Sequence, residues 1–159
     1  MVWIHERVLV GSESACRTGG DGFWVVRACK SPCHQRAVGY RGNLPKDHPN
    51  YLWLRQEADL YLNIIDPPAP LFPDELFQTF LPFAREAWDS DGTLIVHCNQ
   101  GESRAPSLSM IFLAKHVGSL PNDSFEEARR EFMKIFPGYA PGGGIAKYLA
   151  ANWKTLDAF

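Results

Sequence analysis

Apolar residues recur along this chain in two patterns, and the first is typical of strands. Short runs rich in β-branched and aromatic residues are bounded by glycine, proline or polar clusters. We therefore expect two short strands about a tight turn within residues 2–10 and a buried strand at 22–29. A further strand is expected within 51–65, where it ends before a proline-rich loop, and another at 93–97. The run at 93–97 is interpreted as the central strand.

The second pattern places apolar residues at helical spacing over longer stretches. Acidic residues after Pro73 open one such stretch, in which Pro82 is expected to produce a kink. Ser124 and Glu127 form a capping box that opens another. Two more helices are predicted at about 106–116 and from the glycines at 142–144 to about Leu156. Residues 30–50 show no clear period and are expected to form an extended surface loop.

Strands separated by helices predict the fold class. We expect one α/β domain over 1–159, with a central, mostly parallel sheet of four to five strands flanked by helices. In such sheets ligands bind beyond the carboxyl ends of the strands. Cys98, directly after the run at 93–97, would lie at that edge.

Composition narrows the classes of function. The chain has 159 residues, 45% of them hydrophobic and 21% charged, with a net charge of −2. This balance argues against a surface built for nucleic acid or anionic membrane. No apolar run reaches the length of a membrane span, and the first residues do not have the pattern of a secretory signal. We expect a monomeric cytoplasmic protein without nucleic-acid or membrane partners.

The segment 93–107 carries the most specific chemistry. An apolar strand ends directly before Cys98, and five residues, Gly101 among them, separate Cys98 from Arg104. A helical pattern follows Arg104. Backbone N–H groups of a tight loop at a helix N-terminus form a cradle for an anion. The planar guanidinium of Arg104 can grip two phosphate oxygens, and the positive field favours the thiolate form of Cys98 at neutral pH.

These residues resemble the signature of a known family. Val96-His97-Cys98-x5-Arg104 is similar to the motif of the cysteine-dependent protein phosphatases, and the short chain looks most like their dual-specificity branch. The resemblance is sharp from about Asp59 to Leu113. It implies a central sheet flanked by helices and a substrate that is a phosphorylated protein or peptide, with no cofactor and no metal.

The resemblance also implies roles for individual residues. Cys98 is the expected nucleophile, and His97 is expected to orient the loop or tune the thiol through a hydrogen bond. The phosphate would be held by the side chain of Arg104 and by loop amides. The expected phosphate-binding residues are Asn99, Gln100, Gly101, Glu102, Ser103 and Arg104.

The alcohol of a phosphate monoester departs readily only when its oxygen is protonated. Asp66 is the expected general acid, because it directly follows an apolar strand, precedes a proline-rich loop and matches the position of the acid in the family. Asp59 and Asp74 are the alternatives, and Asp74 is better explained as a charge in the first turn of a helix. The expected mechanism passes through a phosphocysteine that water hydrolyses, with Asp66 then acting as a base.

One position departs from the family pattern. Members usually carry Ser or Thr directly after the arginine, where the hydroxyl helps the thiolate leave, and here that residue is Ala105. Ser107 lies two residues further on. We therefore expect slow breakdown of the phosphoenzyme, and a degenerate phosphatase that only binds phosphorylated partners remains an alternative.

Two further alternatives concern substrate and chemistry. The substrate could instead be an RNA 5′ end or a phosphoinositide, and the basic residues Arg36, Arg41 and Lys46 support this alternative. Glu102 at the loop rim argues against such a highly charged ligand. A rhodanese-like sulfurtransferase would not explain Arg104 together with Asp66.

The other cysteines suggest two minor possibilities. The spacing Cys29-x3-Cys33-His34 suggests a zinc site, with His48 as a distant fourth ligand. The spacing is loose and contains a proline, so free thiols in a loop are favoured. Cys29 could also approach Cys98 and form a protective disulfide under oxidation.

Overall fold

The computed structural model describes residues 1–159 as one mixed sheet with helices. The sheet has the strand order β1-β2-β6-β3-β5-β4. Its strands are β1 (Val2–His5), β2 (Val8–Gly11), β3 (Phe23–Arg27), β4 (Trp53–Gln56), β5 (Asp59–Leu62) and β6 (Thr93–His97). The four central strands are parallel, whereas β1 and β4 add antiparallel edges. The fold class expected from the sequence is confirmed.

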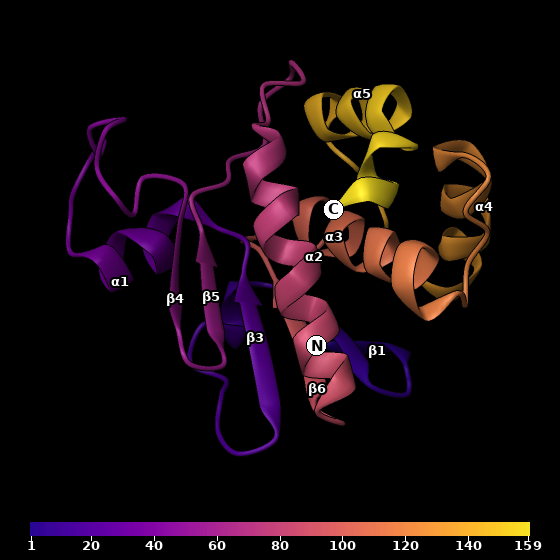
Figure 1. Cartoon of the computed structure of the whole chain (residues 1–159), viewed down its shortest axis with the longest axis horizontal. Coiled ribbons are helices and arrows are strands. Elements are labelled where there is room, and N and C mark those ends of the chain that lie inside the picture. Colours follow the sequence, from indigo (N-terminus) through magenta and orange to yellow (C-terminus); the bar gives the residue numbers. More distant parts are fainter.

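The helices are distributed unequally about this sheet. They are α1 (Gln35–Val38), α2 (Asp74–Asp89), α3 (Arg104–Phe112), α4 (Phe125–Ile135) and α5 (Gly143–Asn152). Short helical turns cover Glu13–Ala15, Lys30–His34, Leu113–Val117 and Thr155–Ala158. Figure 1 shows α2 lying over the strands with α3, α4 and α5 gathered beside it, while α1 lies apart, beyond β4. None of these helices is both long and apolar enough to cross a membrane.

The two faces of the sheet bury very different amounts of apolar surface. The core between the sheet and helices α2–α5 contains 36 buried residues. On the other face only Leu9, Val25 and Ile95 form a buried apolar cluster. Since side chains alternate along a strand, His97 lies on the face of Ile95, and Val96 faces the main core. The second face therefore depends on more than apolar packing.

Several elements differ from the sequence-based expectation. The segment 51–65 forms the hairpin β4–β5, not a single strand, because Glu57 adopts a left-handed conformation (φ 52°) at the turn. With the antiparallel edges, the sheet has six strands instead of four to five. Residues 30–50 contain the turn Lys30–His34 and the one-turn helix α1, which is too short to show a period in sequence.

The helix boundaries also shift. Helix α3 begins at Arg104 and not at Pro106, so the arginine of the motif belongs to its first turn. Ser124 caps α4 as expected, accepting a hydrogen bond from the Glu127 N–H at 3.2 Å. The last predicted helix ends at Asn152, and a separate turn covers Thr155–Ala158.

Candidate active site

The loop that follows β6 surrounds the Cys98 sulfur with backbone donors. Cys98 is buried, and the Gly101 N–H donates to its Sγ at 3.3 Å. The loop ends where α3 begins, so the positive end of the helix dipole lies at the loop. The N–H groups of Gln100, Glu102 and Ser103 donate to no protein acceptor. The loop therefore offers unpaired donors to an anion.

Gly101 is required by geometry. Its φ is +80°, a region that a residue with a Cβ rarely adopts. A Cβ there would also lie 2.9 Å from the carbonyl oxygen of Gly11, at the end of β2. The Cys98 N–H donates to that same carbonyl at 3.3 Å. The loop is thus folded tightly against the end of the neighbouring strand.

The guanidinium of Arg104 is held from behind by three acceptors. Its Nη1 donates to the carbonyl oxygens of Ile64 (3.0 Å) and Ala28 (3.3 Å), which follow β5 and β3. Its Nη2 donates to Oδ1 of Asn99 at 2.8 Å. The buried Nε has no partner. These bonds fix the plane of the fork and leave a charged donor for a ligand.

The other loop side chains have mainly structural contacts. Asn99 also donates to the Ser31 carbonyl at 2.8 Å and so ties the loop to the segment after β3. Ser103 Oγ accepts from the Gly142 N–H at 2.8 Å, just before α5. The side chains of Gln100 and Glu102 are exposed at the rim.

Asp66 lies against the residue that Ser103 binds. It is exposed, and a Cβ on Gly142 would lie 2.7 Å from its Cγ, so carboxyl group and glycine are in close contact. The Gly144 N–H donates to the Pro67 carbonyl at 3.1 Å, which fixes the loop after Asp66 to the start of α5. The carboxyl group is thereby held near Ser103 of the loop that follows β6.

The two alternative acids have other partners. Asp59 forms an ion pair with Arg27 at 2.6 Å. Asp74 accepts a hydrogen bond from the Tyr148 hydroxyl at 2.5 Å. Both carboxylates are therefore engaged, whereas Asp66 makes no such bond.

His97 is completely buried, and neither ring nitrogen has a side-chain hydrogen-bond partner. The hydrogen bond expected to the thiol is therefore not formed. Burial and the nearby charge of Arg27 lower the pKa of His97 to about 4, whereas the Cys98 backbone acts on the ring in the opposite direction and raises its pKa. The ring is therefore neutral near pH 7.

The hydroxyl of Ser107, two residues after Ala105, already has a hydrogen-bond partner. Ala105 is buried, and Ser107 Oγ lies 2.8 Å from the Tyr139 hydroxyl, with which it shares a buried hydrogen bond. Burial raises the pKa of Tyr139 to about 12, so this phenol stays protonated. Ser107 therefore does not replace the hydroxyl that Ala105 lacks.

Of the four zinc ligands considered from the sequence, Cys29 and Cys33 come together, whereas His34 and His48 do not. His34 is bound on both sides, by the Tyr40 hydroxyl and the Asn50 carbonyl, each at 2.9 Å. His48 Nδ1 accepts from the backbone N–H of Asn50 at 3.0 Å. The ligand atoms that do converge within 4.8 Å belong to Cys16, Cys29, Cys33 and His97. All four cysteines are free, and a hydrogen bond with Cys33 lowers the pKa of Cys29 to about 7.

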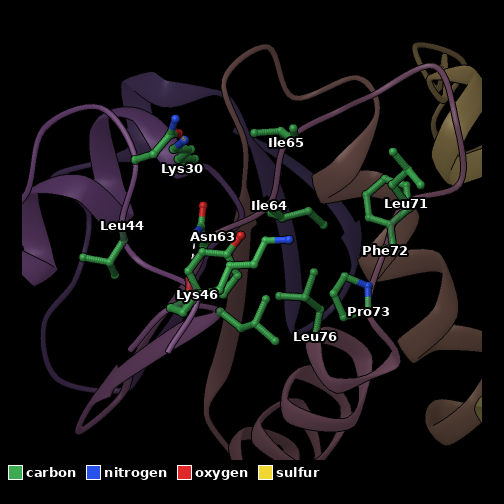
Figure 2. A pocket seen from close by; sticks show the side chains of 13 residues that line it. Lys30, Leu44, Lys46, Asn63, Ile64, Ile65, Leu71, Phe72, Pro73 and Leu76 are labelled. Atoms are coloured by element: carbon green, nitrogen blue, oxygen red, sulfur yellow. Dashed lines mark hydrogen bonds between the residues drawn. The ribbon is translucent and has the colours of Figure 1, made fainter. Parts of the chain in front are cut away.

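A cavity of about 800 Å³ lies beside the segment that follows β5, and none of residues 98–104 lines it. Its wall includes Ile64, whose carbonyl holds Arg104, and Ile65, next to Asp66. Figure 2 shows Leu44 and Lys46 on one side of this cavity and Leu71, Phe72 and Leu76 on the other. Arg36 and Arg41 line a different cavity. Lys46 shares the first cavity with Lys30, so Arg36, Arg41 and Lys46 do not line a single cavity.

Solved structures share this architecture over almost the whole chain. The human tyrosine phosphatase-like serine/threonine/tyrosine-interacting protein is 16% identical, with a TM-score of 0.67, over 99% of this chain and 97% of its own. Human DUSP28 is 19% identical, with a TM-score of 0.63, over 97% and 93%. PTPMT1, solved in complex with PI(5)P, is 19% identical, with a TM-score of 0.65, over 98% and 95%.

Comparison by sequence gives no match, neither to a family model nor to a curated protein. The fold is thus recognisable although no similarity is detected at the level of sequence. The protein has the dual-specificity phosphatase fold, and it carries a Cys-x5-Arg loop after the central strand of that fold.

Proposed function

We propose that this protein is a cysteine-dependent phosphatase that hydrolyses phosphate monoesters through a phosphocysteine. The observation that carries the proposal is the arrangement of Cys98 and Arg104 about one loop. A buried sulfur accepts the Gly101 N–H, and a guanidinium held by three acceptors keeps Nε unpaired. A phosphate dianion bound by these donors would place its phosphorus next to the sulfur.

The reaction then has two displacements. The Cys98 thiolate attacks phosphorus in line, the bond from phosphorus to the ester oxygen breaks, and Asp66 gives its proton to that oxygen. In the second step Asp66 takes a proton from water, the resulting hydroxide attacks phosphorus, and the sulfur–phosphorus bond breaks. Inorganic phosphate leaves and the thiolate is restored. Arg104 and the loop amides hold the non-bridging oxygens in both steps.

The expected substrate is a phosphorylated protein, with phosphotyrosine favoured and phosphoserine or phosphothreonine as further possibilities. The cavity beside the segment after β5, lined mostly by apolar residues together with Lys30 and Lys46, would accept residues that flank the phosphorylated side chain. Exposed Glu102 disfavours a ligand with many phosphate groups. One structural relative was solved with a phosphoinositide, so a phosphoinositide belongs in the substrate panel.

One observation favours a second candidate function, capture of phosphorylated partners without turnover. Ala105 has no hydroxyl, Ser107 is hydrogen-bonded to Tyr139, and Ser103 Oγ accepts from the Gly142 N–H, so the position directly after the arginine offers no hydroxyl to assist departure of the thiolate. A protein that forms the phosphocysteine and hydrolyses it slowly would hold phosphate for a long time. Because the first displacement releases the dephosphorylated partner, capture of the partner itself requires that the bound phosphate is not attacked by Cys98.

A single set of assays separates them. Rapid mixing with p-nitrophenyl phosphate should give a burst of one p-nitrophenol per active site, followed by slower turnover that orthovanadate inhibits. Cys98→Ser should abolish burst and turnover. A burst without turnover would show that the second displacement is blocked, whereas binding of a phosphopeptide without any burst would support capture. Wild type that neither reacts with nor binds a phosphopeptide would contradict both candidates. A panel of phosphotyrosyl and phosphoseryl peptides, phosphoinositide and RNA 5′-phosphate then defines the substrate class.

A further inference from the structure

A group of metal-binding side chains lies outside the chemistry described above. We name it the thiol–imidazole cluster, and its members are Cys16, Cys29, Cys33 and His97. One ligand atom from each member lies within 4.8 Å of the others. Nothing in the proposed phosphatase mechanism uses three thiols and an imidazole at this place.

The members come from three neighbouring parallel strands. His97 is the last residue of β6, flanked in register by Gly11 of β2 and Arg27 of β3. Cys16 follows β2 after one short helical turn, and Cys29 follows β3 by two residues. The topology thus brings together residues that are distant in sequence.

The imidazole is the second, independent observation. His97 is 0% exposed, and neither ring nitrogen has a side-chain hydrogen-bond partner, although buried polar groups are nearly always paired. The unpaired ring is part of a group whose other three members carry sulfur. A metal ion bound at one ring nitrogen would supply a partner that no side chain of the protein gives.

The chemistry of the donors selects the metal. Three thiolates and one neutral imidazole form one of the ligand sets of structural zinc. Tetrahedral zinc–sulfur bonds of about 2.3 Å place the sulfurs ~3.8 Å apart, within the span of the cluster. The Cys16 and Cys33 sulfurs are 2.9 Å apart, whereas a disulfide has about 2.05 Å. A disulfide between these two would leave Cys29 and His97 without a role.

We propose that the thiol–imidazole cluster is a structural zinc site. Zinc binding would release the three thiol protons to solvent and leave a site with one net negative charge. The nearby cation Arg27 donates to the Cys16 carbonyl at 2.5 Å and so fixes the backbone of one ligand. A cavity of about 230 Å³, lined by Cys16 and Cys33, gives the metal a path from solvent.

The site would support the face of the sheet that lacks a large core. Only three apolar residues are clustered there, and zinc would join the segments that follow β2 and β3 to the end of β6. His97 directly precedes Cys98, and Ala28, next to Cys29, holds Arg104 through its carbonyl. All four coordination positions are taken by protein, so the metal is structural and does not touch substrate.

Metal analysis tests the proposal without any assay of activity. The protein is purified with a mild reductant and without chelator, and metals are measured by inductively coupled plasma mass spectrometry. One zinc per chain is expected in wild type and in Cys98→Ser, and its loss in Cys16→Ser and Cys33→Ser. Loss of zinc in Cys98→Ser would place the metal at the catalytic loop and overturn the proposal.

A second measurement uses wild type alone, in case the serine variants do not fold. X-ray absorption at the zinc edge should show three sulfurs at about 2.3 Å and one nitrogen at about 2.0–2.1 Å. Reduced protein that binds no added Zn²⁺, or that contains a Cys16–Cys33 disulfide by peptide mapping, would overturn the proposal. Either result leaves the proposed phosphatase function untouched, because that function is tested by the burst.

Discussion

The position of Asp66 rests on a glycine that the reaction itself does not use. A Cβ on Gly142 would lie 2.7 Å from the Asp66 Cγ, whereas carbon atoms pack at about 3.5–4.0 Å. Gly142→Ala therefore requires the carboxyl group to move by roughly 1 Å. The backbone at Gly142 (φ −59°, ψ 153°) accepts alanine without strain, so the change acts through this contact.

A displacement of that size is enough to impair proton transfer. A positioned general acid contributes roughly 10²–10⁴ in rate, and a 1 Å misplacement can remove 10²-fold. We expect kcat/KM for phosphotyrosyl peptides to fall by roughly 10- to 100-fold, or about 1.4–2.8 kcal/mol in the barrier. The loss should be smaller for p-nitrophenyl phosphate, because p-nitrophenolate leaves without full protonation.

Gly143→Ala is the matched control. Its Cβ would meet only the Pro68 carbonyl oxygen at 3.4 Å, which is an ordinary contact, and it leaves Asp66 in place. Steady-state kinetics on both substrates, with thermal unfolding to confirm the fold, makes the comparison. Wild-type kcat/KM on the peptide in folded Gly142→Ala, or equal losses in the two variants, would refute Asp66 as the acid held by this contact.

Three further variants test the loop and its neighbours. Ala105→Ser should raise steady-state kcat by roughly one order of magnitude and reduce the burst, because the new hydroxyl stabilises the departing thiolate; an unchanged rate in rapid-mixing experiments would count against a slow second step. Ser107→Ala should lower the free energy of unfolding by about 1–3 kcal/mol, measured in urea, since Tyr139 loses its buried partner. Its kcat should stay at the wild-type value, and a large fall would show that Ser107 acts in the reaction after all. Gly101→Ala should abolish activity. Its control is Gly118→Ala, which has a similar φ (73°) and open space around it, and which should lose about 1–2 kcal/mol of stability and no activity. An active Gly101→Ala enzyme would contradict the tight loop.

The local part of the site could be read from sequence. Strand, cysteine, glycine, arginine and helix follow one another within 93–112, so no long-range contact is needed to recognise the loop. Asp66 is predicted as the acid from an apolar strand followed by prolines and from its match to the position of the acid in the resembled family. The central strand, the capped helix α4 and the α/β class were predicted for the same reason, because each depends on neighbours in the chain.

Contacts between segments that are distant in the chain could not be predicted from the sequence. The close approach of Gly142 to Asp66 joins α5 to the loop after β5, and nothing in a run of three glycines shows what they face. The pairing of Ser107 with Tyr139 is of the same kind. The cysteine spacing suggested His34 and His48 as metal ligands, whereas Cys16 and His97 join Cys29 and Cys33 only because parallel strands bring their ends together.

The covalent step is the centre of the account, and it can be observed directly. The enzyme is mixed with substrate, quenched in acid within the burst and digested, and the peptide that contains Cys98 is examined by mass spectrometry. We expect one phosphoryl group on Cys98 in wild type and none in Cys98→Ser. Substrate hydrolysis with no phosphoryl group on Cys98 at any quench time, or equal hydrolysis by Cys98→Ser, would contradict the mechanism.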